Sequence, residues 1–138
     1  MKMSYGGVVI NRDGQVLLRE PTGHYGGYVW THAKGQPEPG ETPEETALRE
    51  VKQETGIEAR IVKRLAGTFK GTTGLTMFFL MAVAQDTGQF DPEETQTVVW
   101  VEPQEAAKLI MLTPDPIGRE RDLNALREAY AAFRQGLS

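Results

Sequence analysis

The sequence predicts an α/β fold formed by a single domain. The chain has 138 residues, of which 39% are hydrophobic and 25% are charged, a composition typical of one globular core. Strand-like segments stand before and after one strongly amphipathic helical segment, and a second long helical segment closes the chain. No internal repeat, low-complexity tract or long linker divides residues 1–138, so we expect one domain.

The first strand signals lie on either side of a tight turn. Residues 8–10 and 16–18 are aliphatic, and the segment between them contains an Asp-Gly pair, which is a strong turn signal. This pattern predicts a β-hairpin. Residues 21–27 are rich in glycine and proline, which predicts a loop, and residues 28–31 then predict a short strand.

The clearest helix in the sequence begins after Thr42. Thr42 is a capping residue and Pro43 suits the first helical position. Glu45 completes a capping box, and Gly56 ends the helix. Residues suited to packing recur at helical spacing along one side of this helix, at Ala47, Leu48, Val51 and Thr55. We expect that side to pack inward and the glutamates to point elsewhere.

The chain beyond this helix is rich in strand signals and ends in helices. Residues 57–69, 75–83 and 97–101 predict strands, with a turn at residues 71–74. A short helix is expected at residues 105–110, and two prolines then break the chain between residues 113 and 116. The closing helix is predicted over residues 119–133, where the apolar spacing is helical at Leu123, Leu126, Tyr130 and Phe133.

Charge and cysteine content narrow the function. The formal net charge of −4 argues against a nucleic acid polymer as partner, because such proteins normally carry a basic surface. The chain has no cysteine, so a metal would be a hard, oxygen-ligated cation such as Mg²⁺ or Mn²⁺. No stretch is long and apolar enough to span a membrane and no signal segment is recognisable, so we expect a cytoplasmic protein that does not bind membranes.

A spaced motif in residues 35–57 carries the chemistry. Glu50, Gln53 and Glu54 stand at i, i+3 and i+4, so on a helix their side chains share one face and can converge on a single cation. The motif contains Gly35, Glu41, Arg49, Glu50, Glu54 and Gly56, with aliphatic residues at Val51 and Ile57. It resembles the Nudix box, G-x5-E-x7-R-E-U-x-E-E-x-G-U with U aliphatic, at all fixed positions but one.

The resemblance to the Nudix family implies a fold, an activity and a site. The fold would be an α/β/α sandwich with a mixed β-sheet between helices. The activity would be Mg²⁺-dependent hydrolysis of a phosphoanhydride bond in a nucleotide, with Mn²⁺ as a second possibility. The metal ligands would be the Gly35 carbonyl, Glu50, Gln53, Glu54 and Glu94, and the catalytic residues would be Glu50, Glu54 and Glu94, with Glu50 or Glu94 as general base.

The one departure from the box is Gln53, which stands where the family has a glutamate. An amide offers one carbonyl oxygen and no charge. Another carboxylate compensates, or metal affinity falls, or the residue was introduced to trap a complex, or the domain has lost activity. Glu94 lies six residues before Trp100, where family members commonly place a further acidic residue, although residues 91–94, which include Glu93, also fit a solvated acidic turn.

Four residues before the box are candidates for binding substrate. Lys34 directly precedes Gly35, and Arg19 is a second cation for phosphate. Tyr25 and His32 belong to an aromatic cluster that could stack on a base, although a histidine without a partner pattern is more often a hydrogen-bonding residue.

The spacing of Trp30, Lys34, Gly35, Gly40 and Glu41 looks like that of small bacterial diadenosine polyphosphate hydrolases. We therefore expect a diadenosine polyphosphate or a nucleoside triphosphate as substrate. A catalytically weakened nucleotide-binding or regulatory module is the alternative that Gln53 raises. The sequence is compatible with either a monomer or a homodimer.

Overall fold

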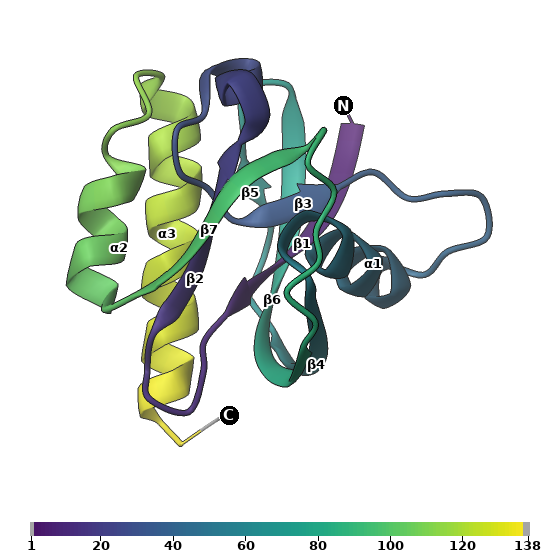
Figure 1. Ribbon diagram of the computed structural model, residues 1–138, viewed down its shortest axis with the longest axis vertical. Coiled ribbons are helices and arrows are strands. Elements are labelled where there is room, and N and C mark those ends of the chain that lie inside the picture. The colour runs from purple at the N-terminus through teal and green to yellow at the C-terminus, as the bar shows by residue number, and fades with distance from the viewer. Residues whose placement is uncertain (1, 137–138) are drawn as a thin grey trace.

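The computed structural model describes residues 2–136. Figure 1 shows the elements, which in chain order are β1 (Lys2–Val9), β2 (Val16–Pro21), η1 (Thr22–Gly27), β3 (Ala33–Gly35), α1 (Pro43–Thr55), β4 (Ile57–Arg64), β5 (Phe69–Lys70), β6 (Gly74–Asp86), β7 (Thr95–Val101), α2 (Pro103–Ile110) and α3 (Pro116–Arg134).

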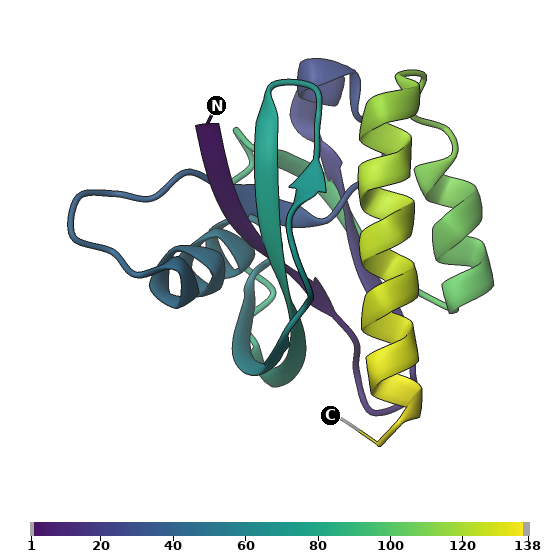
Figure 2. The same cartoon turned by 180° about the vertical axis from the view of Figure 1, so that it is seen from behind.

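The strands form two sheets that lie between helices. The larger sheet has the order β3-β1-β6-β4, with β5 paired to β6, and the smaller sheet consists of β2 and β7. Strand β1 runs parallel to β6, whereas the other pairs are antiparallel, so the larger sheet is mixed. Helix α1 packs against β1, β3 and β4, and α3 packs against β5, β6 and α2 on the other side (Figures 1 and 2). The α/β/α sandwich is confirmed.

Alternation along the strands divides the core into two parts. Val8, Phe78 and Leu80 belong to a cluster with α2 and α3, while their chain neighbours Val9, Phe79 and Met81 belong to a cluster with α1. Successive strand residues point to opposite faces of a sheet, so strands that are apolar throughout can serve both helical layers. This arrangement fixes α1 against one face of the larger sheet.

The predicted hairpin at the start of the chain is wrong beyond its turn. Gly14 takes the left-handed conformation, with φ of 77°, and a single bridge joins Ile10 to Val16. The two strands then separate, because β1 pairs with β3 and β6 while β2 pairs with β7. A turn signal is local, whereas the choice of partner strand depends on segments distant in sequence.

The predicted strand at residues 28–31 is also wrong. Residues 22–27 form the short helical segment η1, in which Gly23, His24 and Gly26 have positive φ angles. After it, Thr31 makes only an isolated bridge to Arg19, and the regular strand is Ala33–Gly35. Gly23 and Gly26 take these left-handed conformations without strain, and regular strand pairing begins only at Ala33.

Helix ends follow the capping signals, and two helices begin earlier than predicted. Helix α1 has the predicted capping box between Thr42 and Glu45, and Gly56 closes it with φ of 78°. Helices α2 and α3 each begin at a proline, Pro103 and Pro116, because proline is well accommodated in the first turn. Among residues 2–136, no helix has the length and apolar character needed to cross a membrane.

Candidate functional site

Three carboxylates converge at one point of the structure. Glu50 and Glu54 extend from α1, and Glu94 extends from the turn that precedes β7. One carboxylate oxygen from each of the three lies within 4.8 Å of the other two. Glu50 is 8% exposed and Glu54 is 6% exposed, so the prediction that the helix glutamates point away from the packed side is wrong for these two. Their face of α1 lies against β3.

Gly35 on β3 gives Glu50 its place. A Cβ atom at Gly35 would lie 2.2 Å from the carboxyl carbon and from Oε2 of Glu50, far inside a normal van der Waals contact. The glycine therefore lets a carboxylate approach the backbone of β3 directly. Such proximity of a backbone segment to a carboxylate is what the predicted role of the Gly35 carbonyl requires.

Arg49 on α1 connects the helix to the loop that precedes it. Its Nε donates to Glu41 Oε2 at 2.6 Å, its Nη1 donates to Glu50 Oε1 at 2.6 Å and its Nη2 donates to the carbonyl of Gln36 at 3.1 Å. The hydrogen bonds from Arg49 lower the pKa of Glu41 to about 2. Arg49 thereby ties Glu50 to the loop of residues 36–42, which projects from the body between β3 and α1 in Figure 1.

Burial and mutual proximity control the charge of the cluster. Burial raises the pKa of Glu54 well above its ordinary value, opposed by the charge of Arg19 and reinforced by Glu50. Burial and the charge of Glu50 also raise the pKa of Glu94. Three carboxylates so close together resist full ionisation unless a cation joins them.

Arg19 supports the cluster from β2. Its Nε donates to Thr95 Oγ1 at 2.8 Å and its Nη2 donates to the carbonyl of Glu94 at 2.6 Å. The same Nε lies 3.6 Å from Glu54 Oε1. We predicted that Arg19 contacts substrate, but these bonds commit much of its guanidinium to holding the turn of Glu94 beside α1.

Gln53 lies beside the carboxylates and contacts one of them. Its Nε2 donates to Glu94 Oε1 at 3.2 Å, and its backbone carbonyl accepts a hydrogen bond from the Asp91 amide at 2.9 Å. The structure thus brings together Gly35, Glu50, Gln53, Glu54 and Glu94, the residues predicted as a metal site. Glu93, next to Glu94, is exposed.

Lys34 lies beside the carboxylates, whereas His32, just before β3, is buried away from them. The Lys34 amide donates to Glu54 Oε1 at 3.1 Å, and burial together with the charge of Arg121 lowers the pKa of the Lys34 ammonium. His32 is 1% exposed and its Nε2 lies 3.0 Å from the carbonyl of Asp122. A direct contact of His32 with substrate does not fit this burial. Its ring instead packs edge-on against Phe78.

Sequence reasoning missed a buried polar group behind Lys34. Asp122 Oδ1 accepts from Arg121 Nε at 3.0 Å, and Asp122 Oδ2 accepts from Thr31 Oγ1 at 2.6 Å. The Arg121 guanidinium also lies 4.6 Å from the centre of the Tyr28 ring. Arg121 and Asp122 are both buried, so Arg121 fixes the N-terminal half of α3 onto the segment that leads into β3. A charged pair at the start of a helix gave no sequence signal of this burial.

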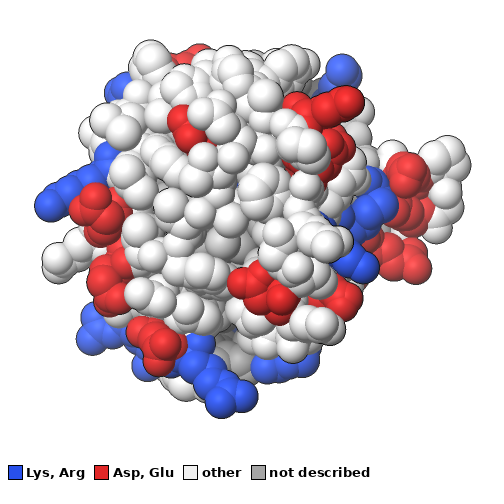
Figure 3. All heavy atoms as spheres, viewed as in Figure 1, with Lys and Arg blue, Asp and Glu red and all other residues white. Residues whose placement is uncertain are grey.

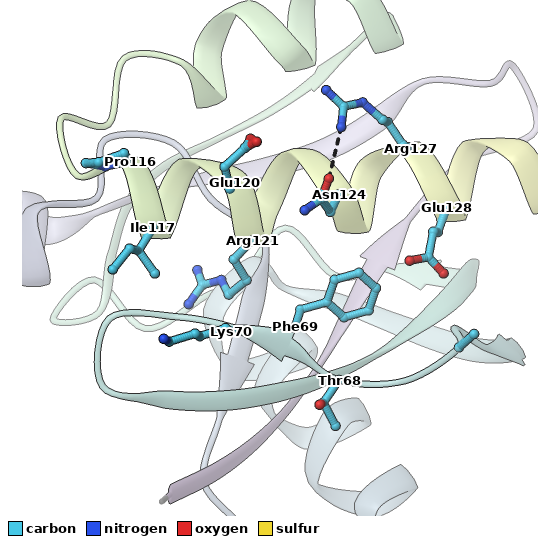
Figure 4. A pocket seen from close by; sticks show the side chains of 11 residues that line it. Thr68, Phe69, Lys70, Pro116, Ile117, Glu120, Arg121, Asn124, Arg127 and Glu128 are labelled. Carbon is cyan, nitrogen blue, oxygen red and sulfur yellow. Dashed lines mark hydrogen bonds between the residues drawn. The ribbon is translucent and has the colours of Figure 1, made fainter.

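Two further surface features are an exposed aromatic ring and a hollow. Tyr25 is 85% exposed at the tip of η1, where a ligand can reach it. A hollow of about 650 Å³ lies between α3 and β5, and Figure 4 shows Phe69, Lys70 and Arg121 around it. On the face seen in Figure 3, both acidic and basic side chains are present and no continuous basic patch is visible.

The donor set fits a hard divalent cation. Carboxylate and backbone carbonyl oxygens are the ligands that Mg²⁺ and Mn²⁺ accept, and Gly35 leaves the backbone open toward Glu50. Glu50, Glu54 and Glu94, with Gly35 beside them, are the residues that could hold such an ion. The fold and the acidic cluster on α1 thus define a class, an α/β/α sandwich with a glutamate-rich helix beside a candidate metal site.

Comparison with known proteins identifies the family. Residues 2–121 match the NUDIX domain, so the chain belongs to the Nudix family and is a hydrolase. The CTP pyrophosphohydrolase of Escherichia coli is 31% identical over 126 residues, which cover 90% of this chain and 93% of that protein. The RNA pyrophosphohydrolase of Proteus mirabilis is 41% identical over 63 residues, 46% of this chain and 34% of that protein.

Solved structures show the same architecture. The Escherichia coli ORF135 protein has 27% identity and a TM-score of 0.64, covering 98% of this chain and 94% of its own. An Ap4A hydrolase from C. elegans has a TM-score of 0.74 over 99% of this chain and 100% of that chain, at 23% identity. At that identity the likeness concerns the fold alone.

Proposed function

We propose that this chain is a Mg²⁺-dependent Nudix pyrophosphohydrolase that cleaves a phosphoanhydride bond in a nucleoside polyphosphate. The observation that carries the proposal is the convergence of Glu50, Glu54 and Glu94 within 4.8 Å, next to Gly35, where any side chain would displace Glu50. Mn²⁺ is the natural substitute for Mg²⁺ at such a site.

Each residue of the cluster has a role that follows from its surroundings. Glu54 is the most buried of the three and would be the central ligand, with Glu50 held beside it by Arg49. The Gly35 carbonyl would complete the ligand set from β3. When bound, the cation would neutralise phosphate oxygens and lower the pKa of an attacking water.

Glu94 is the carboxylate that we assign as general base. It is the least buried of the three, and it belongs to a turn rather than to the helix. Burial and Glu50 raise its pKa, which makes it a better proton acceptor once it is ionised. Glu50 is less suited, because one of its oxygens accepts from the charged guanidinium of Arg49, whereas the donor to Glu94 is the neutral amide of Gln53.

Cations and an aromatic ring are available for the rest of the substrate. The Lys34 ammonium, adjacent to the cluster in the chain, would bind a phosphate, and loss of its hydration on burial would strengthen that contact. Tyr25 would stack on a base, because its ring is almost fully exposed. Arg19 would reach a phosphate only in addition to its bonds with Thr95 and Glu94.

The substrate that we propose is a nucleoside triphosphate or a diadenosine polyphosphate. The near full-length similarity to a CTP pyrophosphohydrolase supports the first, and the spacing from Trp30 to Glu41 supports the second. The alternative of a weakened binding module rests on Gln53 alone. The presence of Glu94 in the cluster favours an active enzyme.

Product analysis tests this proposal. The purified chain is incubated with ATP, CTP, dCTP or diadenosine tetraphosphate, with Mg²⁺ or with a chelator, and the products are separated by anion-exchange chromatography. We expect a triphosphate to give a nucleoside monophosphate and pyrophosphate, and the dinucleotide to give two mononucleotides. Both reactions should stop with chelator. Absence of turnover with the whole panel would favour the binding module.

A matched pair of variants ties the activity to the cluster. Glu54→Gln should lower the rate by roughly a hundredfold or more, as when one charge-stabilising group is removed from an active site. Glu44→Gln makes the same change on an exposed position of the same helix and should leave the rate unchanged. Equal rates for the two variants would place the reactive centre elsewhere.

A further inference from the structure

Gln53 touches the turn of Glu94 in two places. Its side-chain Nε2 donates to Glu94 Oε1 at 3.2 Å. Its backbone carbonyl accepts from the Asp91 amide at 2.9 Å. Residue 53 therefore joins helix α1 to both ends of the four-residue turn that presents Glu94.

The turn is itself well defined. The amides of Glu94 and Thr95 both donate to the Asp91 carbonyl, at 3.1 and 2.9 Å, and the Glu93 amide donates to Asp91 Oδ1 at 2.9 Å. On the far side, Arg19 Nη2 holds the Glu94 carbonyl at 2.6 Å. The backbone of Glu94 is thus fixed from β2, and the remaining freedom is in its side chain.

The amide of Gln53 is oriented with its NH₂ toward Glu94. A carboxylate oxygen of Glu94 accepts the hydrogen bond that this NH₂ donates. A glutamate at this position, as the family pattern has, would offer no donor. It would instead place a fourth carboxylate next to Glu94, and like charges at that distance repel.

We infer that Gln53 is a positioning residue: it holds the Glu94 carboxylate toward Glu50 and Glu54 rather than serving as a weakened metal ligand. With glutamine in place of the family's glutamate at residue 53, the site loses one negative charge and gains a hydrogen bond that orients Glu94. Loss of a residue that orients a ligand in this way typically costs about 10–100-fold in metal affinity or activity. The inference rests on the metal site of the proposed function.

Mg²⁺ affinity in a double-mutant cycle tests the inference. Isothermal titration calorimetry of the metal alone is applied to the wild type, Gln53→Met, Glu94→Ala and the double variant. Methionine keeps the length of the side chain and removes the donor. We expect Gln53→Met to weaken Mg²⁺ binding by about tenfold, the lower end of the loss seen when a residue that orients a ligand is removed. In the Glu94→Ala background the same change should have no effect, because it acts only through Glu94.

A direct ligand role gives the opposite pattern. If Gln53 binds the metal through its own oxygen, Gln53→Met weakens binding equally with and without Glu94, and the inference is overturned. Gln104→Met, the same substitution at an exposed glutamine on α2, is the control and should match the wild type. Glu54→Gln distinguishes failure of this inference from failure of the proposed function. If Glu54→Gln leaves the Mg²⁺ affinity unchanged, the metal site of the proposed function is wrong.

A second measurement needs no metal. In the chelator-treated ¹⁵N-labelled protein, the side-chain amide protons of Gln53 should resonate apart from those of Gln104 and should return to the position of an exposed amide in Glu94→Ala. Gln53 resonances that ignore the loss of Glu94 would contradict the hydrogen bond itself. Glu94→Ala alters only a half-exposed side chain on a turn, so we expect it to fold. The backbone amide resonances of the same spectrum check that fold.

Discussion

Replacing Gly35 by alanine tests how closely β3 and the carboxylates fit together. The added Cβ would lie 2.2 Å from Oε2 of Glu50, whereas nonbonded heavy atoms are comfortable at about 3.5 Å. Glu50 must therefore withdraw by roughly 1 Å, and a misplacement of that size in a reacting group costs about a hundredfold in rate. This loss corresponds to an increase of about 2.7 kcal/mol in the activation free energy. The crowding should also cost about 1–3 kcal/mol of stability.

The assay compares kcat/KM of Gly35→Ala with that of the wild type on the nucleotide that the wild type hydrolyses best. Gln36→Ala is the control, because the Gln36 side chain is exposed and only its backbone carbonyl contacts Arg49. The control should retain the wild-type rate and Mg²⁺ requirement. A Gly35→Ala variant that also retains both would refute the close packing of β3 against Glu50 as a requirement of catalysis.

Three other outcomes follow from the charges of the site. The pKa of Glu41 is lowered to about 2 from an ordinary value of 4.5, so its stabilisation is complete above pH 4.5 and is lost as the pH falls toward 2; in urea unfolding, Glu41→Gln should be less stable than the wild type at pH 7, with a difference that shrinks across this window. The pKa of Glu54 is raised, so Mg²⁺ binding should release protons and tighten as the pH rises, which titration calorimetry in buffers of different ionisation enthalpy detects; binding without proton release would show that the cluster is already fully ionised. Glu94→Ala should lower kcat at least about tenfold, or roughly 1.4 kcal/mol, whereas Glu93→Ala should have no effect, and a reversed result would assign the role to Glu93.

The parts of the fold that local chemistry determines were predictable from the sequence. The capping box of Thr42 and Glu45 and the left-handed Gly56 bound helix α1 as predicted. The spacing of Glu50 and Glu54 predicted that both lie on one face of the helix. The distance of Glu94 from Trp100 pointed to Glu94 as a third carboxylate beside them. The helix features depend on helix geometry and on a motif whose members are close in sequence, whereas Glu94 was inferred from resemblance to the family through its distance from Trp100.

The parts that depend on long-range packing were not predictable. The strands on either side of the first turn join different sheets, and nothing local specifies the partners β6 and β7. Glutamates on an amphipathic helix normally face solvent, so the burial of Glu54 becomes visible only once β3 lies on it. The Arg121–Asp122 pair is similar, because the sequence shows two charges and the burial comes from contact with Thr31.

The position of a bound cation tests the central claim most directly. Crystals of the protein grown with Mn²⁺, measured at a wavelength where manganese scatters anomalously, locate the ion without reference to activity. The account predicts an anomalous peak among the carboxylates of Glu50, Glu54 and Glu94, next to the Gly35 carbonyl, and no such peak at this position in Glu54→Gln. A peak at another place in the wild type, with none among these three glutamates, would contradict it.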